Sequence, residues 1–206
     1  SDAVLDIGDQ HMKKGDRVIT YVARNLEPYR GFHMLMRALP DIQEQCPDAQ
    51  IVIVGGDEVS YGKKPPEGRT YRSLYVEEMK SLVDWSRVHF TGRLPYIHYL
   101  NVLRISTVHI YLTYPFVLSW SMLEAMAAGC LVVGSSTSPV QEVIRHGENG
   151  LLVDFFRREQ LAATVGDALN NPALYEEIRR NARKTAVQHY DLKTRCLPEM
   201  LRYLTS

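Results

Sequence analysis

Two arginines, a serine-containing loop and one glutamate are the residues of this sequence best suited to chemistry. Arg24 and Arg30 flank a turn between a predicted strand and a predicted helix, and the planar guanidinium group of arginine matches the oxygens of a phosphate. Ser119 and Ser121 lie in the loop that starts a second predicted helix, which carries Glu124. Because the free N–H groups at a helix start attract anions, a diphosphate fits between this helix and the arginines. We expect the carboxylate of Glu124 to bind neighbouring hydroxyl groups.

Each of these residues also has a purely structural interpretation. Ser121 and Glu124 have the spacing of a capping box, in which the glutamate binds the backbone at the start of its own helix. A single surface arginine pairs weakly with neighbouring carboxylates such as that of Glu27. Trp120 lies in the same loop and either packs on a ligand or is buried in the core. We favour the anion site because both arginines follow a predicted strand and face one helix start.

The elements that position these residues alternate between strands and helices. Apolar, β-rich runs predict six strands, at residues 18–23, 50–54, 88–90, 107–112, 131–133 and 150–153. Helical periodicity follows the strands, and Pro40 is predicted to end the first helix. Three helices are predicted to close the chain, over 157–169, 172–189 and 192–204. This alternation predicts an α/β fold, a Rossmann-like parallel sheet of about six strands with helices on both faces.

Ligands bind parallel α/β sheets at the carboxyl ends of the strands. The candidate site residues are therefore those that directly follow the predicted strands. They are Arg24, residues 55–56, 92–94, 115–121 and 135–139. We expect these segments to converge on one rim of the sheet.

Composition excludes several classes of protein. Lys plus Arg and Asp plus Glu both number 24, so the net charge is zero and gives no support for nucleic-acid binding. The three cysteines are far apart, which is typical of reduced thiols in a cytoplasmic protein. No apolar run reaches the ~20 residues of a transmembrane helix, and no signal peptide opens the chain. Residues 1–16 are polar and weakly patterned, so we expect a linker there, with more chain upstream.

Several common catalytic motifs are absent from the sequence. It has neither the G-x-G-x-x-G fingerprint of dinucleotide binding nor a G-x-x-x-x-G-K-[ST] loop. It has no Asp-x-Asp pair to hold a metal on a diphosphate, and its seven histidines form no H-E-x-x-H pair. No G-x-S-x-G elbow surrounds Ser119 or Ser121. We therefore expect neither a metal nor a cofactor.

Five motifs, in order and at predicted strand ends, resemble the C-terminal, donor-binding domain of a GT-B glycosyltransferase, in particular family 4 (group 1). The resemblance covers residues 18–190. The motifs are Arg24 with Arg30 and Gly31, VGGD at 54–57, FTGRL at 90–94, EAMAAG at 124–129, and PVQEV at 139–143 with GENGLLV at 147–153.

The resemblance implies a role for each matching residue. Arg24 and Arg30 would hold the donor diphosphate and stabilise the leaving group, with Arg30 in place of the usual lysine. Glu124 would bind the ribose hydroxyls, and the main chain of Leu94 would bind the base. The other nucleotide-sugar-binding residues that it implies are Gly56, Gly92, Arg93, Phe116, Val117, Leu118, Ser119, Trp120 and Ser121.

The chain departs from the family pattern at two positions near the helix start. The family's E-x7-E motif places a sugar-contacting acid where this sequence has Phe116, and a glycine where it has Ser119. Recognition of the donor sugar is therefore expected to differ. Two alternatives stay open: a GT-B-fold sugar-nucleotide epimerase, which would need further acids or histidines at the rim, and a non-catalytic nucleotide-binding scaffold, which Phe116 favours.

The resemblance further implies a retaining, metal-independent transfer of a hexosyl or related group from a UDP-, GDP- or ADP-sugar. The acceptor would be held by an N-terminal domain that this chain lacks, so we expect the chain alone to transfer little or no sugar. Residues 17–190 would form the nucleotide-sugar-binding domain. Residues 191–206 would form a helix that packs on this domain or towards the missing half. We expect a cytoplasmic protein, either free or peripheral to the inner face of the membrane.

Overall fold

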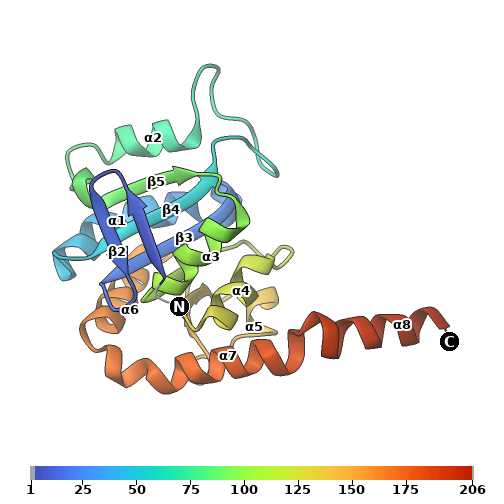
Figure 1. The fold of residues 1–206 in the computed structure, drawn as a ribbon. Coiled ribbons are helices and arrows are strands. Elements are labelled where there is room, and N and C mark those ends of the chain that lie inside the picture. Colours follow the sequence, from blue (N-terminus) through green and yellow to red (C-terminus); the bar gives the residue numbers. More distant parts are fainter. Residues whose placement is uncertain (1–2, 206) are drawn as a thin grey trace.

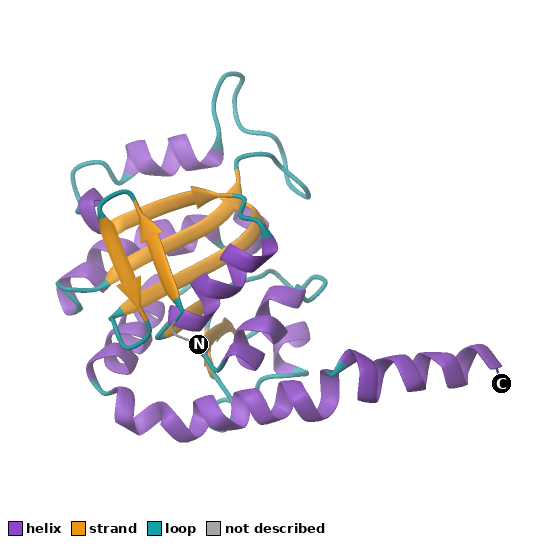
Figure 2. Ribbon diagram, viewed as in Figure 1, coloured by secondary structure: helices purple, strands orange, loops and turns teal. Residues whose placement is uncertain are grey.

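A parallel six-stranded sheet forms the centre of the molecule in a computed structural model that describes residues 3–205 (Figure 1, Figure 2). The strand order is β5-β4-β3-β6-β7-β8, and every neighbouring pair is parallel. The strands are β3 (Val18–Asn25), β4 (Gln50–Gly56), β5 (Val88–Gly92), β6 (Val108–Tyr111), β7 (Leu131–Ser135) and β8 (Leu151–Val153). The predicted Rossmann-like α/β fold is confirmed.

Helices cover both faces of the sheet. One face packs on α1 (Phe32–Gln45) and α6 (Arg158–Asn170), and α2 (Tyr71–Glu78) lies against α1. The helices of the other face are α3 (Tyr96–Ile105), α4 (Trp120–Ala128), the short α5 (Ser138–Gln141) and α7 (Glu176–Tyr190). Because side chains alternate along a strand, Ile51 of β4 packs on the α1 side while Val52 packs on the α3 side.

The N-terminal segment, which we predicted to be a linker over 1–16, forms a hairpin in its described part. Strands β1 (Val4–Ile7) and β2 (Gln10–Lys13) pair antiparallel, with Leu5 opposite Met12. Both side chains are buried, in a cluster that includes Val102 of α3. The alternating apolar pattern that predicts a strand is weak here, because few apolar side chains form the buried face of the hairpin.

Helix α1 continues through Pro40, which the sequence predicts to end it. Proline inside a helix costs roughly 3 kcal/mol, because it removes one hydrogen bond and crowds the preceding turn. The apolar stripe of α1 is fully buried on both sides of Pro40, from Leu35 and Leu39 to Ile42. Each such side chain contributes about 1.5–3 kcal/mol on burial, so together they outweigh the proline.

The C-terminal helices extend from the sheet domain. Helix α7 packs on α4 and passes through a π-helical turn at Leu192–Cys196 into α8 (Leu197–Thr205). Helix α8 runs out beyond the rest of the domain, at the red end of the ribbon (Figure 1). The side chains of Leu197 and Met200 on this helix are exposed.

Candidate functional site

The loop before α4 delivers the start of this helix to the carboxyl edge of the sheet. Ser119 is the N-cap, and its hydroxyl accepts a hydrogen bond from the N–H of Ser121 at 3.4 Å. The N–H of Ser119 donates to the hydroxyl of Tyr111 at the end of β6, at 2.7 Å. The helix ends at Gly129, whose φ of 84° is the left-handed conformation that glycine adopts without strain. Both ends of α4 are therefore fixed by local contacts.

Glu124 does not cap its own helix, so the capping-box interpretation is wrong. The cap is Ser119, and Glu124 lies beyond the first turn of α4. Its carboxylate instead accepts hydrogen bonds from the hydroxyls of Tyr96, at 3.1 Å, and Tyr99, at 2.7 Å. Burial, and then the bond to Glu124, raise the pKa of Tyr99, which keeps this hydroxyl a donor. The two tyrosines hold the carboxylate at a fixed place on the rim.

A hollow of about 940 Å³ lies in front of Glu124. Arg24 lines it from the end of β3, and Arg93 and Leu94 line it from the end of β5. The remaining residues that line it are Val22, Ala23, Asn25, Val54, Gly55, Ser60, Tyr96 and Tyr99. The structure thus brings together a cation and a carboxylate that are one hundred positions apart in the sequence.

Arg24 and Arg93 differ in their surroundings. The Arg93 guanidinium donates to the side chains of Asn25, at 2.9 Å, and Glu58, at 2.7 Å. The exposed side chain of Arg24 has no hydrogen-bond or ion-pair partner among residues 3–205. Gly56 packs behind the Arg93 contacts, where an added Cβ would collide with the Glu58 carboxylate. Arg24 is consequently the cation of this hollow that remains available to an anionic ligand.

Arg30, which we expected beside Arg24, does not line the hollow and lies against the loop before α4. Its guanidinium donates to the hydroxyl of Thr113 at 3.1 Å and to the carbonyl of Val117 at 3.0 Å. The aromatic rings of Tyr61 and Phe116 flank the same guanidinium, with centroids 5.4 and 5.7 Å from its central carbon. Arg30 is thereby tied to the segment that precedes α4, and α4 carries Glu124.

Most of the other predicted site residues lie in the loop before α4 or at the start of α4, and Gly92 lies at the end of β5. Val117 is exposed, and Leu118 and Phe116 are half-buried. Trp120 is 73% exposed and lines a smaller hollow against the end of α7, so it is neither in the core nor against Arg24. Gly92 ends β5 with a φ of 67° and turns the chain towards Arg93.

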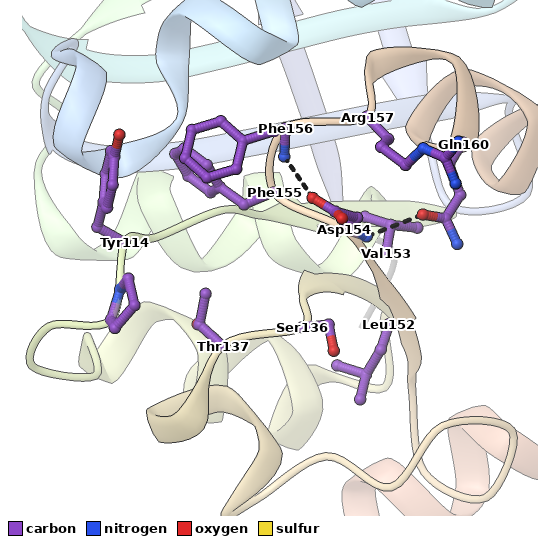
Figure 3. A pocket seen from close by; sticks show the side chains of 11 residues that line it. Tyr114, Ser136, Thr137, Leu152, Val153, Asp154, Phe155, Phe156, Arg157 and Gln160 are labelled. Atoms are coloured by element: carbon purple, nitrogen blue, oxygen red, sulfur yellow. Dashed lines mark hydrogen bonds between the residues drawn. The ribbon is translucent and has the colours of Figure 1, made fainter.

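A second hollow, of about 540 Å³, opens beyond the ends of β7 and β8 (Figure 3). Tyr114, Phe155 and Phe156 form its aromatic side, and Asp154 and Arg157 line it as well (Figure 3). Pro115, Ser136 and Thr137, which belong to the candidate segments at strand ends, line this second hollow and not that of Glu124. The strand-end segments therefore do not all converge on one hollow.

Tyr96 and Tyr99 belong to the site although the motifs of the sequence do not point to them. The two tyrosines are three residues apart on α3 and therefore share one face of that helix. This spacing is the one available signal, but it is equally typical of a core-facing stripe. The geometry also holds no set of three or more His, Cys, Asp or Glu side chains placed for a metal ion within residues 3–205. Nor does any helix in that range have the length and apolar character needed to cross a bilayer.

Comparison with known families decides which class of protein carries this arrangement. The family model described as glycosyl transferases group 1 matches residues 6–185. The chain belongs to the group 1 glycosyl transferases. The group 1 match covers part of the hairpin, the whole six-stranded sheet and most of α7.

Relatives of this group 1 chain include spore coat protein SA of Bacillus subtilis, which is 28% identical over 185 residues, covering 85% of this chain and 45% of that protein. A GDP-mannose-dependent α-(1-6)-phosphatidylinositol monomannoside mannosyltransferase of Mycolicibacterium smegmatis is also 28% identical, covering 88% of this chain and 46% of the enzyme. The chain spans less than half the length of these relatives.

Solved structures share the fold of this group 1 chain at low identity. Anabaena Alr3699/HepE in complex with UDP-glucose has a TM-score of 0.78 and 22% identity, over 93% of this chain and 49% of that one. The C-terminal domain of the group 1 protein LpcC from Francisella tularensis has a TM-score of 0.73 and 18% identity, over 87% and 89% of the two chains. The match to LpcC therefore takes in most of both chains.

Proposed function

We propose that this chain is the C-terminal, donor-binding half of a family 4 glycosyltransferase with the GT-B fold, and that it binds a nucleoside diphosphate sugar. The observation that carries the proposal is the shared hollow of Arg24 and Glu124. A guanidinium group is suited to bind the phosphates of a nucleotide, and a carboxylate is suited to bind the hydroxyl groups of its sugar. Membership of group 1 and the UDP-glucose complex of a fold neighbour support the same ligand class.

Each part of the donor has a partner in this proposal. The base binds the main chain of Leu94, and the ribose hydroxyls bind Glu124, whose carboxylate the two α3 tyrosines already orient. The diphosphate lies between Arg24, Arg30 and the start of α4. Breaking the sugar–phosphate bond leaves negative charge on the diphosphate, and fixed cations lower the barrier because they need no rearrangement as that charge develops.

The transfer itself is proposed to need a second half. We infer a retaining reaction without a metal, with the acceptor supplied by an N-terminal domain. The length of the relatives, about twice that of this chain, supports a longer whole protein. The exposed apolar residues of α8, which include Leu197 and Met200, provide a surface for that domain. A non-catalytic nucleotide-binding scaffold is the second candidate, because Phe116 puts an aromatic ring where the family pattern has an acid.

Calorimetric titration of the chain with UDP, GDP and ADP, and with their glucose conjugates, tests donor binding. One of these nucleotides is expected to bind, and Arg24→Ala should weaken it about 10- to 100-fold, because a charged hydrogen bond contributes about 1.5–3 kcal/mol. Arg180→Ala removes an exposed arginine of α7 and is the matched control. Unchanged affinity in Arg24→Ala would refute the proposed role. Sugar transfer by the full-length protein would then distinguish an enzyme from a scaffold.

A further inference from the structure

Arg30 is enclosed by aromatic rings that come from two separate loops. Tyr61 lies in the long loop between β4 and α2, and Phe116 lies in the loop between β6 and α4. Their rings meet edge to face, with centroids 4.9 Å apart and planes at 63°. The Arg30 guanidinium lies within 5.4 and 5.7 Å of the two ring centres. Both distances are within the range of a cation–π contact.

The loop that carries Tyr61 is held by a buried carboxylate. Glu27 is 1% exposed, and its Oε2 accepts the backbone N–H groups of Ser60, Tyr61 and Gly62 at 3.2, 3.1 and 3.4 Å. A buried carboxylate is costly unless it is hydrogen-bonded, so these three bonds fix Glu27 and the loop together. Glu27, three residues before Arg30 in the sequence, therefore holds Tyr61 in place against Arg30.

Two of the three expected departures from the family pattern, those at positions 30 and 116, touch each other in this structure. By the resemblance, Arg30 stands where the family has a lysine, and Phe116 stands where it has an acid. A guanidinium group is planar and stacks on aromatic rings, whereas a lysine ammonium group offers no plane. The arginine at position 30 and the aromatic ring at position 116 are therefore chemically suited to each other. The Nη1 group of Arg30 donates to the hydroxyl of Thr113 and to the carbonyl of Val117, and these two bonds fix the plane of the guanidinium.

We propose that Tyr61 and Phe116 form a clamp that orients the Arg30 guanidinium towards the donor diphosphate, with Glu27 as a positioning residue that sets the clamp. The inference rests on the proposed function, since it assigns a task within the same donor site. It makes Phe116 a residue that acts on the diphosphate through Arg30 instead of a residue that recognises the sugar.

Titration of the chain with UDP and with uridine separates the diphosphate contribution from that of base and ribose. Phe116→Leu and Tyr61→Leu are each expected to lower UDP affinity about 2- to 30-fold, the range of a cation–π contact, while uridine affinity stays constant. Glu27→Gln should reproduce part of the loss, because a neutral oxygen accepts hydrogen bonds more weakly. Phe156→Leu removes an exposed ring from the other hollow and is the matched control. Equal losses for UDP and uridine would overturn the clamp.

A double-mutant cycle with Arg30→Met tests whether the rings act through Arg30. In that background Phe116→Leu should have no further effect on UDP affinity, because the group that it orients is gone. If the two losses multiply, the clamp is wrong. Binding of UDP that depends on Arg24 but not on Phe116 or Tyr61 would overturn the clamp alone. Failure of the unaltered chain to prefer any nucleoside diphosphate over its nucleoside would overturn the proposed function as well.

Discussion

Glu124→Gln is the substitution that most sharply separates ligand binding from structural support. The side chain keeps its shape but loses its charge and one acceptor oxygen. In the structure the carboxylate oxygens accept hydrogen bonds from Tyr96 and Tyr99, and neither caps α4, whose cap is Ser119. The substitution is therefore expected to leave the start of the helix intact.

The expected magnitude follows from the type of hydrogen bond that is weakened. A bond between a carboxylate and a ribose hydroxyl contributes about 1.5–3 kcal/mol, against about 0.5–1.5 kcal/mol for a neutral pair. The difference of roughly 1–1.5 kcal/mol for each hydroxyl corresponds to about a 5- to 15-fold loss of affinity. The preference for UDP over 2′-deoxy-UDP should fall by about the same factor, because the 2′-hydroxyl is the group concerned.

Calorimetry with the two nucleotides measures this preference, and urea denaturation of both proteins measures stability. Glu177→Gln, at an exposed glutamate in the first turn of α7, is the matched control. Loss of stability with an unchanged preference for the ribonucleotide would refute the role of Glu124 in ribose binding.

Two further predictions concern stability. Met12→Ala should lower the free energy of unfolding by about 2–5 kcal/mol, the usual cost of emptying such a core position, since Met12 is 2% exposed in the N-terminal hairpin; a urea midpoint equal to that of the unaltered chain would show that the hairpin is not part of the folded core. Burial lowers the pKa of His109 to about 3 from an ordinary value of about 6.5. Between these values the unfolded chain binds a proton that the folded chain excludes, so stability should fall as pH drops below about 6.5, by up to about 1.4 kcal/mol per unit. His109→Gln should flatten this dependence in urea titrations at pH 7 and 5, leaving the part due to His33 and His89, since burial lowers the pKa of His33 to about 4 and also lowers the pKa of His89; an unchanged slope would contradict the assignment.

Most of the fold follows from local patterns in the sequence. The six buried strands are short apolar runs, and their alternation with helices leaves few topologies to consider. The hairpin escaped prediction because Leu5 and Met12 provide too little periodicity. The sequence does not predict that α1 continues through Pro40, because its continuation depends on how completely Leu39 and Ile42 are buried. Only the packed structure reveals that burial.

The site is predictable to the extent that strand ends converge. That rule places Arg24 and the start of the helix that carries Glu124 on one rim, and the structure has Arg24 and Glu124 in one hollow. The partners of these residues depend on loop conformation, which sequence periodicity does not encode. Tyr61 meets Arg30 only because Glu27 holds three successive backbone amides of a long loop.

A crystal structure of this chain with bound UDP would test the central claim most directly. We predict that the ribose hydroxyls lie at the Glu124 carboxylate and that the diphosphate lies within hydrogen-bonding distance of Arg24 and Arg30. Density for the nucleotide in the aromatic hollow beside Phe156 instead, with Arg24 and Glu124 untouched, would contradict it.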